Sequence, residues 1–259
     1  MKLPEHLASS MQKYWDKQES LFKEIKKAGG INTYVNSFEK KGGLFTLENR
    51  SVCCIDERTT QGKIHYAGSG ILDRDQAINR IKNIEADGVY SHEECGAAAL
   101  AFKGLSEEEK EKFQTPEAYA KWWAEHVSKE LGIPYKGHLE THPKFHIARV
   151  SYYDGTGRFD PSQSDKLPPG FLISRAYLDP EYAAKELDLS VAIAFGKDAF
   201  GKEKFIESPF LIIPVADKES SHLTLEMLKE EAQKIAKNYE GKVIVDGLSV
   251  DLASLLQKP

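Results

Sequence analysis

Two cysteines and one histidine in the first half of the chain have the residue types and the spacing of a metal site. Cys54 opens a Cys-x-Asp-x-Arg motif, and His92 and Cys95 form a His-x-x-Cys motif. Two thiolates and one imidazole suit zinc. Three protein ligands with an open fourth position are typical of a catalytic zinc site, whereas a structural site needs four ligands. The sequence therefore predicts one Zn²⁺ per chain, held by Cys54, His92 and Cys95.

An acidic and a basic residue follow Cys54 at alternate positions. Asp56 and Arg58 can pair, because residues two apart on an extended strand end point the same way. A surface pair would add at most about 1 kcal/mol of stability. Beside a metal, Arg58 would instead hold Asp56 off the zinc, and Asp56 would accept the proton or the hydrogen bond of a water at the fourth position. We therefore predict that Asp56 and Arg58 are catalytic residues.

A strand–helix–strand unit is expected to position both motifs. Residues 51–55 form a short apolar run, a helix with an apolar face is expected over 73–86, and a second strand over 89–91. Such a unit requires a parallel sheet with a right-handed crossover. Ligands bind at the carboxyl ends of parallel strands, where both motifs fall. The predicted fold class is α/β, with a central, largely parallel sheet flanked by helices.

Hydrophobic periodicity and turn residues predict the remaining elements. In the first part of the chain we expect helices over 4–28, 95–102 and 106–131, a strand over 146–153 and a hairpin turn over 154–157. After a loop over 160–170, we expect strands over 171–177, 190–195, 210–215 and 242–246, and helices over 179–187, 221–239 and 250–256.

The composition excludes several classes of function. A hydrophobic content of 41% is ordinary for a globular protein, and a net charge of −5 argues against a nucleic-acid partner. No apolar run approaches the roughly 20 residues that span a bilayer, and no secretory signal is visible. Three cysteines, two of them adjacent, suit metal binding in a reducing cytoplasm better than disulfides. We expect a cytoplasmic protein with no membrane partner; a homo-oligomer is left open.

The two motifs and the segment between them resemble β-class carbonic anhydrases. Residues 63–70 are similar to that family's second strand and Ala-Gly loop, and 88–91 to the strand that delivers its histidine ligand; the similarity covers roughly residues 10–160. The resemblance implies a lyase in which zinc-bound hydroxide attacks carbon dioxide and forms bicarbonate. It also implies that Asp56 can swing onto the zinc and stop the reaction when its pair with Arg58 breaks.

The loop that begins at Ala67, after the segment similar to the family's second strand, is expected to contact the substrate. Its backbone N–H groups could approach a bound anion, and a plain tight turn is the alternative. The predicted substrate-binding residues are Ala67, Gly68, Ser69 and Gly96. The sequence departs from the family in a shorter connection between the two motifs, in Glu57 where Ser is usual, and in His65-Tyr66 where Arg-Asn is usual.

The second half of the chain is predicted to be a degenerate copy of the first. Residues 190–193 are similar to 51–54, and 210–246 to 63–91. Ile193 then stands in the place of the first cysteine ligand, so the copy lacks metal ligands. Since βα repeats resemble one another by pattern alone, chance similarity is the alternative.

The family resemblance and the similarity between the two halves of the chain predict two domains. A zinc-binding domain is expected over residues 1–160, and a degenerate α/β repeat packed on it over 171–259. The main expectation for function is reversible hydration of carbon dioxide. Two alternatives keep the zinc: hydrolysis of carbonyl sulfide or carbon disulfide, and a non-catalytic site in which Asp56 closes the coordination sphere.

Overall fold

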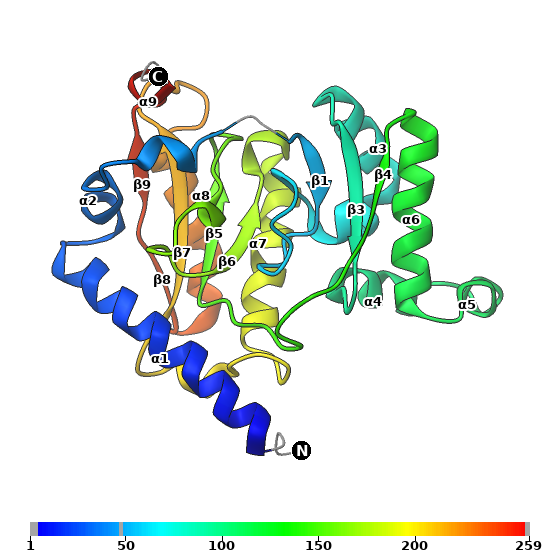
Figure 1. Cartoon of the computed structure of the whole chain (residues 1–259), viewed down its shortest axis with the longest axis horizontal. Helices are drawn as coiled ribbons and strands as arrows, with labels where there is room; N and C mark the ends of the chain where they lie inside the picture. Colours follow the sequence, from blue (N-terminus) through cyan, green and yellow to red (C-terminus); the bar gives the residue numbers. More distant parts are fainter. Residues whose placement is uncertain (1–4, 47–48, 257–259) are drawn as a thin grey trace. The chain divides into compact units, whose positions relative to one another are not determined.

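The computed structural model describes residues 5–46 and 49–256. The chain divides into two compact units. One, the terminal unit, comprises Met1–Thr46 and Phe145–Pro259, and the other, the inserted unit, comprises Leu47–Lys144. Each unit contains a parallel sheet flanked by helices (Figure 1). The predicted α/β class is therefore confirmed, with two sheets rather than one central sheet.

The inserted unit has a four-stranded sheet in the order β2-β1-β3-β4, in which every neighbouring pair is parallel. Its strands are β1 (Ser51–Cys53), β2 (Ile64–His65), β3 (Gly88–His92) and β4 (Tyr135–Leu139). Its helices are a short 3₁₀ segment η2 (Ala67–Asp73), α3 (Arg74–Asn83), α4 (Gly96–Lys103), α5 (Glu107–Phe113) and α6 (Pro116–Leu131). Val52, Cys53 and Val89 are completely buried, as expected for parallel strands covered on both faces.

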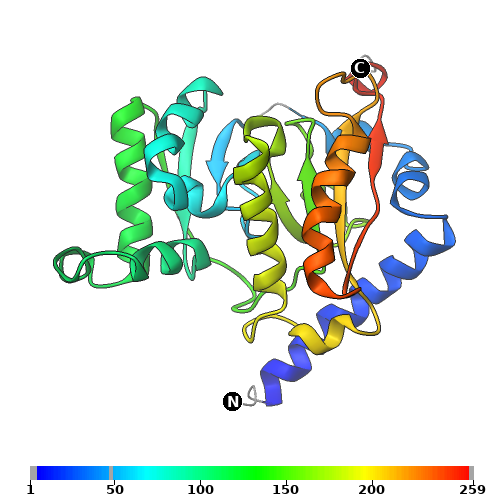
Figure 2. The same ribbon diagram turned by 180° about the vertical axis from the view of Figure 1, so that it is seen from behind.

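The terminal unit has a second parallel sheet in the order β6-β5-β7-β8, with β9 also paired to β7. Its strands are β5 (Val150–Asp154), β6 (Gly170–Ile173), β7 (Phe210–Asp217), β8 (Val243–Val245) and β9 (Leu248–Val250). Its α-helices are α1 (Glu5–Lys27), α2 (Ile31–Asn36), α7 (Pro180–Ala194), α8 (Leu225–Ala236) and α9 (Leu252–Leu256). Its 3₁₀ segments are η1 (Lys41–Leu44), η3 (Pro161–Gln163), η4 (Arg175–Tyr177), η5 (Lys202–Phe205) and η6 (Lys237–Tyr239). Figure 2 shows α7 and α8 side by side on one face of this sheet.

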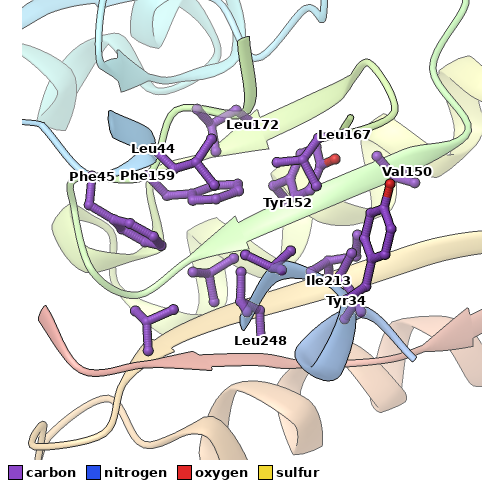
Figure 3. Close-up of a cluster of buried hydrophobic side chains, with 14 of the residues drawn as sticks. Tyr34, Leu44, Phe45, Val150, Tyr152, Phe159, Leu167, Leu172, Ile213 and Leu248 are labelled. Atoms are coloured by element: carbon purple, nitrogen blue, oxygen red, sulfur yellow. The ribbon is translucent and has the colours of Figure 1, made fainter. Parts of the chain in front are cut away.

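The core of the terminal unit explains why its boundaries differ from the predicted domains 1–160 and 171–259. Tyr34 and Phe45, from the N-terminal segment, pack in one buried cluster with Tyr152 and Leu248 (Figure 3). Strand β5, which was expected in the first domain, pairs with β6 and β7. Pairing between segments far apart in the chain therefore decides the division, and short-range sequence patterns do not contain that information.

Two predicted elements are wrong. The expected strand over 190–195 lies in α7, where Leu187, Ser190, Val191 and Ala194 are buried at helical spacing. The expected hairpin over 154–157 does not form, because β5 and β6 run parallel and cannot be joined by a tight turn. In its place the Asp154 carboxylate accepts hydrogen bonds from the backbone and side chain of Thr156.

The two sheets nevertheless share one topology. In each, the first strand along the chain is flanked by the second on one side and by the third on the other, and the fourth pairs with the third. The counterpart of β1 is therefore β5, so the register that matched residues 190–193 to 51–54 is wrong.

In the part of the chain that the structure describes, no helix has both the length and the apolar character needed to cross a membrane.

Candidate metal centre

Cys54, His92 and Cys95 converge at one edge of the sheet of the inserted unit. Cys54 directly follows β1, His92 is the last residue of β3, and Cys95 caps α4. Because β1 and β3 are parallel neighbours, with Val52 opposite Val89, their carboxyl ends lie together. Parallel pairing thus brings the two sequence motifs into a single site.

The geometry of the three side chains fits a metal ion. One ligand atom from each lies within 4.8 Å of the others, and all three residues are buried. The two sulfur atoms are 4.0 Å apart. Two thiolates on a tetrahedral zinc, with Zn–S bonds of about 2.3 Å, lie about 3.8 Å apart. The group could therefore hold a metal ion.

One hydrogen bond already orients the His92 ring. Its Nδ1 lies 2.7 Å from the carbonyl oxygen of Glu93, and because a carbonyl only accepts, Nδ1 carries the proton. The other nitrogen, Nε2, is buried and has no hydrogen-bond partner among residues 5–46 and 49–256. A buried nitrogen without a partner requires an explanation, and a metal ion is one. A histidine that binds a metal through one nitrogen usually donates the other N–H to a carbonyl or carboxylate, as Nδ1 does here.

Backbone N–H groups support both sulfur atoms. The N–H of Gly68 donates to Cys54 Sγ at 3.1 Å, and that of Ala98 donates to Cys95 Sγ at 3.4 Å. Both bonds stabilise negative charge on sulfur, which is the form that binds a metal.

The protonation of the three groups shows that the site attracts positive charge. Burial raises the pKa of Cys54 well above its usual value, whereas the Cys54 hydrogen bond lowers the pKa of Cys95. The hydrogen bond between the two sulfur atoms thus favours the thiolate form of Cys95 over that of Cys54. Burial would lower the pKa of His92, but Cys54 and Asp56 raise it to about 9. A cation bound by the three ligands would displace these protons and balance the same negative charge.

Asp56 and Arg58 form a buried, doubly hydrogen-bonded pair beside the three ligands. Arg58 Nε and Nη2 donate to the two carboxylate oxygens at 2.9 and 2.7 Å, and the backbone N–H of Arg58 adds a third bond at 3.0 Å. Asp56 Oδ2 lies 4.0 Å from His92 Nδ1. The carboxylate is not one of the groups that cluster with the two sulfur atoms. It is therefore held next to the site and not in it.

The predicted substrate loop supports the metal ligands. Besides the bond from Gly68 to Cys54, the Ser69 hydroxyl donates to the carbonyl of Tyr90, and Trp123 Nε1 donates to the carbonyl of Ser69. A Cβ at Gly68, whose φ is 56°, would lie 2.6 Å from the Ile71 side chain and 3.5 Å from Cys95 Sγ. Substrate contact by Ala67, Gly68, Ser69 and Gly96 (the first residue of α4) stays a prediction.

One supporting residue escaped the sequence reasoning. The buried His65 ring lies between two backbone carbonyls, with Nδ1 2.7 Å from that of Cys54 and Nε2 3.1 Å from that of Gly62. It joins the two ends of the connection that carries Asp56 and Arg58. Burial lowers the pKa of His65 to about 4, although both carbonyl contacts favour the protonated ring. The only sequence signal was its place in the family's Arg-Asn position.

The terminal unit has a carboxylate at the place that corresponds to Cys54. Asp154 is the last residue of β5 and is buried. Its oxygens accept hydrogen bonds from the Thr156 backbone and hydroxyl at 2.8 and 2.6 Å and from the Phe159 backbone at 3.3 Å. Burial raises the pKa of Asp154 to about 6. The loop after β5 thus fills this position with its own donors.

Comparisons of the chain with models of known protein families, with curated proteins and with solved structures find no match.

Proposed function

We propose that this protein binds one Zn²⁺ per chain through Cys54, His92 and Cys95 and catalyses the reversible hydration of carbon dioxide. The observation that carries the proposal is a buried group of three ligands beside a carboxylate that an arginine holds out of the cluster. On the sequence motifs, we further propose that the chain is a divergent relative of the β-class carbonic anhydrases.

The choice of metal rests on the donor set. Two thiolates and an imidazole favour zinc over hard cations such as Mg²⁺ and Ca²⁺, which take oxygen ligands. Three ligands leave a fourth position open, as in catalytic zinc sites. Since thiolate ligands persist in reducing compartments, we propose that the protein works in the cytoplasm.

The residues of the site have separate roles in this proposal. Zinc, when bound, lowers the pKa of water to about 7 and so makes a nucleophile available at neutral pH. Arg58 fixes the Asp56 carboxylate through both of its oxygens. Asp56 accepts a hydrogen bond from the attacking water and so orients it toward the carbon of carbon dioxide. Addition of water gives bicarbonate, and the released proton leaves to solvent.

The terminal unit has no part in this chemistry. We propose that it is a counterpart of the inserted unit without metal, because both sheets have one strand order and Asp154 already receives donors from its own loop. This accounts for the expected ratio of one zinc per chain.

The test is stopped-flow hydration of carbon dioxide by protein of measured zinc content, beside Cys95→Ser and Asp56→Asn. We expect activity in proportion to zinc, loss of zinc and activity in Cys95→Ser, and retained zinc with at least tenfold lower activity in Asp56→Asn. Stoichiometric zinc without hydration at any pH between 6 and 9 would contradict the proposal. Turnover of carbonyl sulfide or carbon disulfide by the same protein would then identify the substrate.

A further inference from the structure

Glu94 lies between the two ligands of the His-x-x-Cys motif and has an unusual backbone conformation. Its φ is 54°, in the left-handed region. For a residue other than glycine this conformation is strained, and it persists only where the surrounding structure requires it. The ordinary function of the motif needs only His92 and Cys95, so the presence of a glutamate at this position requires its own explanation.

The Glu94 side chain reaches the arginine of the buried pair. Its Oε2 lies 3.5 Å from Arg58 Nη1, and the buried hydroxyl of Thr141 donates to the same oxygen at 3.5 Å. About half of the Glu94 side chain is exposed, whereas that of Arg58 is 2% exposed. Glu94 is thus the point at which this buried group of charges meets solvent.

Arg58 has one nitrogen that Asp56 does not use. Nε and Nη2 form the fork on Asp56, while Nη1 donates to the carbonyl of Pro143 at 3.1 Å and faces Glu94. The guanidinium therefore contacts three segments: its own loop, the loop of His92 and Cys95, and the segment after β4. Arg58 is four residues from Cys54, and Glu94 is next to Cys95.

We propose that Glu94 is a positioning residue, which through Arg58 ties the loop that carries His92 and Cys95 to the loop that carries Cys54. The inference rests on the proposed metal function of these loops. In the absence of a metal, the ion pair between Arg58 and Glu94 keeps the three ligand atoms near one another. Zinc binding then needs less ordering of the chain, and ordering is a cost that lowers affinity.

The expected effect is modest, because Glu94 is half exposed and water screens the contact. An ion pair of this kind changes an equilibrium constant by up to about fivefold. Glu94→Gln should therefore weaken the affinity of the metal-free protein for Zn²⁺ by about two- to fivefold. Glutamine has a similar size and similar backbone preferences, so the variant removes charge without relieving the strain.

The experiment measures Zn²⁺ affinity by competition with a chromophoric chelator, on the full chain. The variants are Glu94→Gln, Arg58→Gln and the double variant. Glu140→Gln is the charge-matched control, because its exposed carboxylate pairs with exposed His142 and not with Arg58. We expect Glu94→Gln to weaken binding in the wild-type background, to add nothing in the Arg58→Gln background, and Glu140→Gln to bind as the wild type does. Circular dichroism melting of each metal-free variant checks that it is folded.

Three outcomes separate the proposals. Unchanged affinity in Glu94→Gln would overturn the inference. So would an equal loss in both backgrounds, because it would show a general effect of charge or of structure that does not pass through Arg58. If the wild-type chain itself fails to bind Zn²⁺, the proposed function is refuted, and the tie with it.

Discussion

Removing Arg58 should destabilise the inserted unit more than any loss of a surface ion pair could. The side chains of Arg58 and Asp56 are 2% and 4% exposed, and two side-chain hydrogen bonds join them. Arg58→Gln would leave the carboxylate buried without its cation. Breaking a buried pair in this way costs about 3–5 kcal/mol, against at most about 1 kcal/mol for an exposed pair.

The assay is urea unfolding of the metal-free protein, followed by far-ultraviolet circular dichroism, for the wild type, Arg58→Gln, Asp56→Asn and the double variant. We expect Arg58→Gln to lose about 3–5 kcal/mol. The double variant should regain most of this loss, because it buries no unpaired charge. A loss below about 1 kcal/mol in Arg58→Gln would show that the pair contributes no more than an exposed ion pair. A double variant less stable than the sum of the two single losses predicts would also contradict the proposed energetic role of the pair.

Three further predictions concern groups around the two sheets. Gly68→Ala places a Cβ 2.6 Å from Ile71 at a φ of 56°, so unfolding titration should show a loss of about 1–3 kcal/mol, and an unchanged midpoint would contradict the strained loop. The pKa of Asp154 is raised to about 6, so its stabilising contribution is present below pH 4 and is lost as the pH rises through 6. The free energy of unfolding should therefore fall by about 3 kcal/mol between pH 4 and pH 7, and Asp154→Asn should remove this fall. The pKa of His65 is lowered to about 4, so its contribution is present above pH 6.5 and is lost as the pH falls through 4; His65→Gln should flatten that acid loss, and an equal loss in the variant would show that another group titrates.

The sequence predicted the parts of the site that depend on short-range order. Cys54, His92 and Cys95 could be grouped because each motif falls at the end of a strand, and a βαβ unit places two such ends on one edge. The pairing of Asp56 with Arg58 could be predicted for a similar reason, since only one residue separates them. The α/β class followed from the same alternation of strand and helix patterns.

The errors arose where the outcome depends on contacts between distant segments. The apolar run at 190–195 suits a buried strand or a buried helix equally, and the packing of α7 decides for the helix. The division of the chain depends on pairing of β5 with β6 and β7, which no local pattern reveals. The roles of His65 and Glu94 depend on what the fold places beside their side chains, so residue type alone could not predict them.

Zinc K-edge X-ray absorption on the purified protein, together with its zinc content, reports directly on whether Cys54, His92 and Cys95 hold the metal. We expect one zinc per chain with two sulfur ligands near 2.3 Å, one imidazole nitrogen and one further light atom in the open fourth position. Cys54→Ser should lose one sulfur ligand or the metal. Protein without zinc, or zinc with any other number of sulfur ligands, would contradict the proposed metal site.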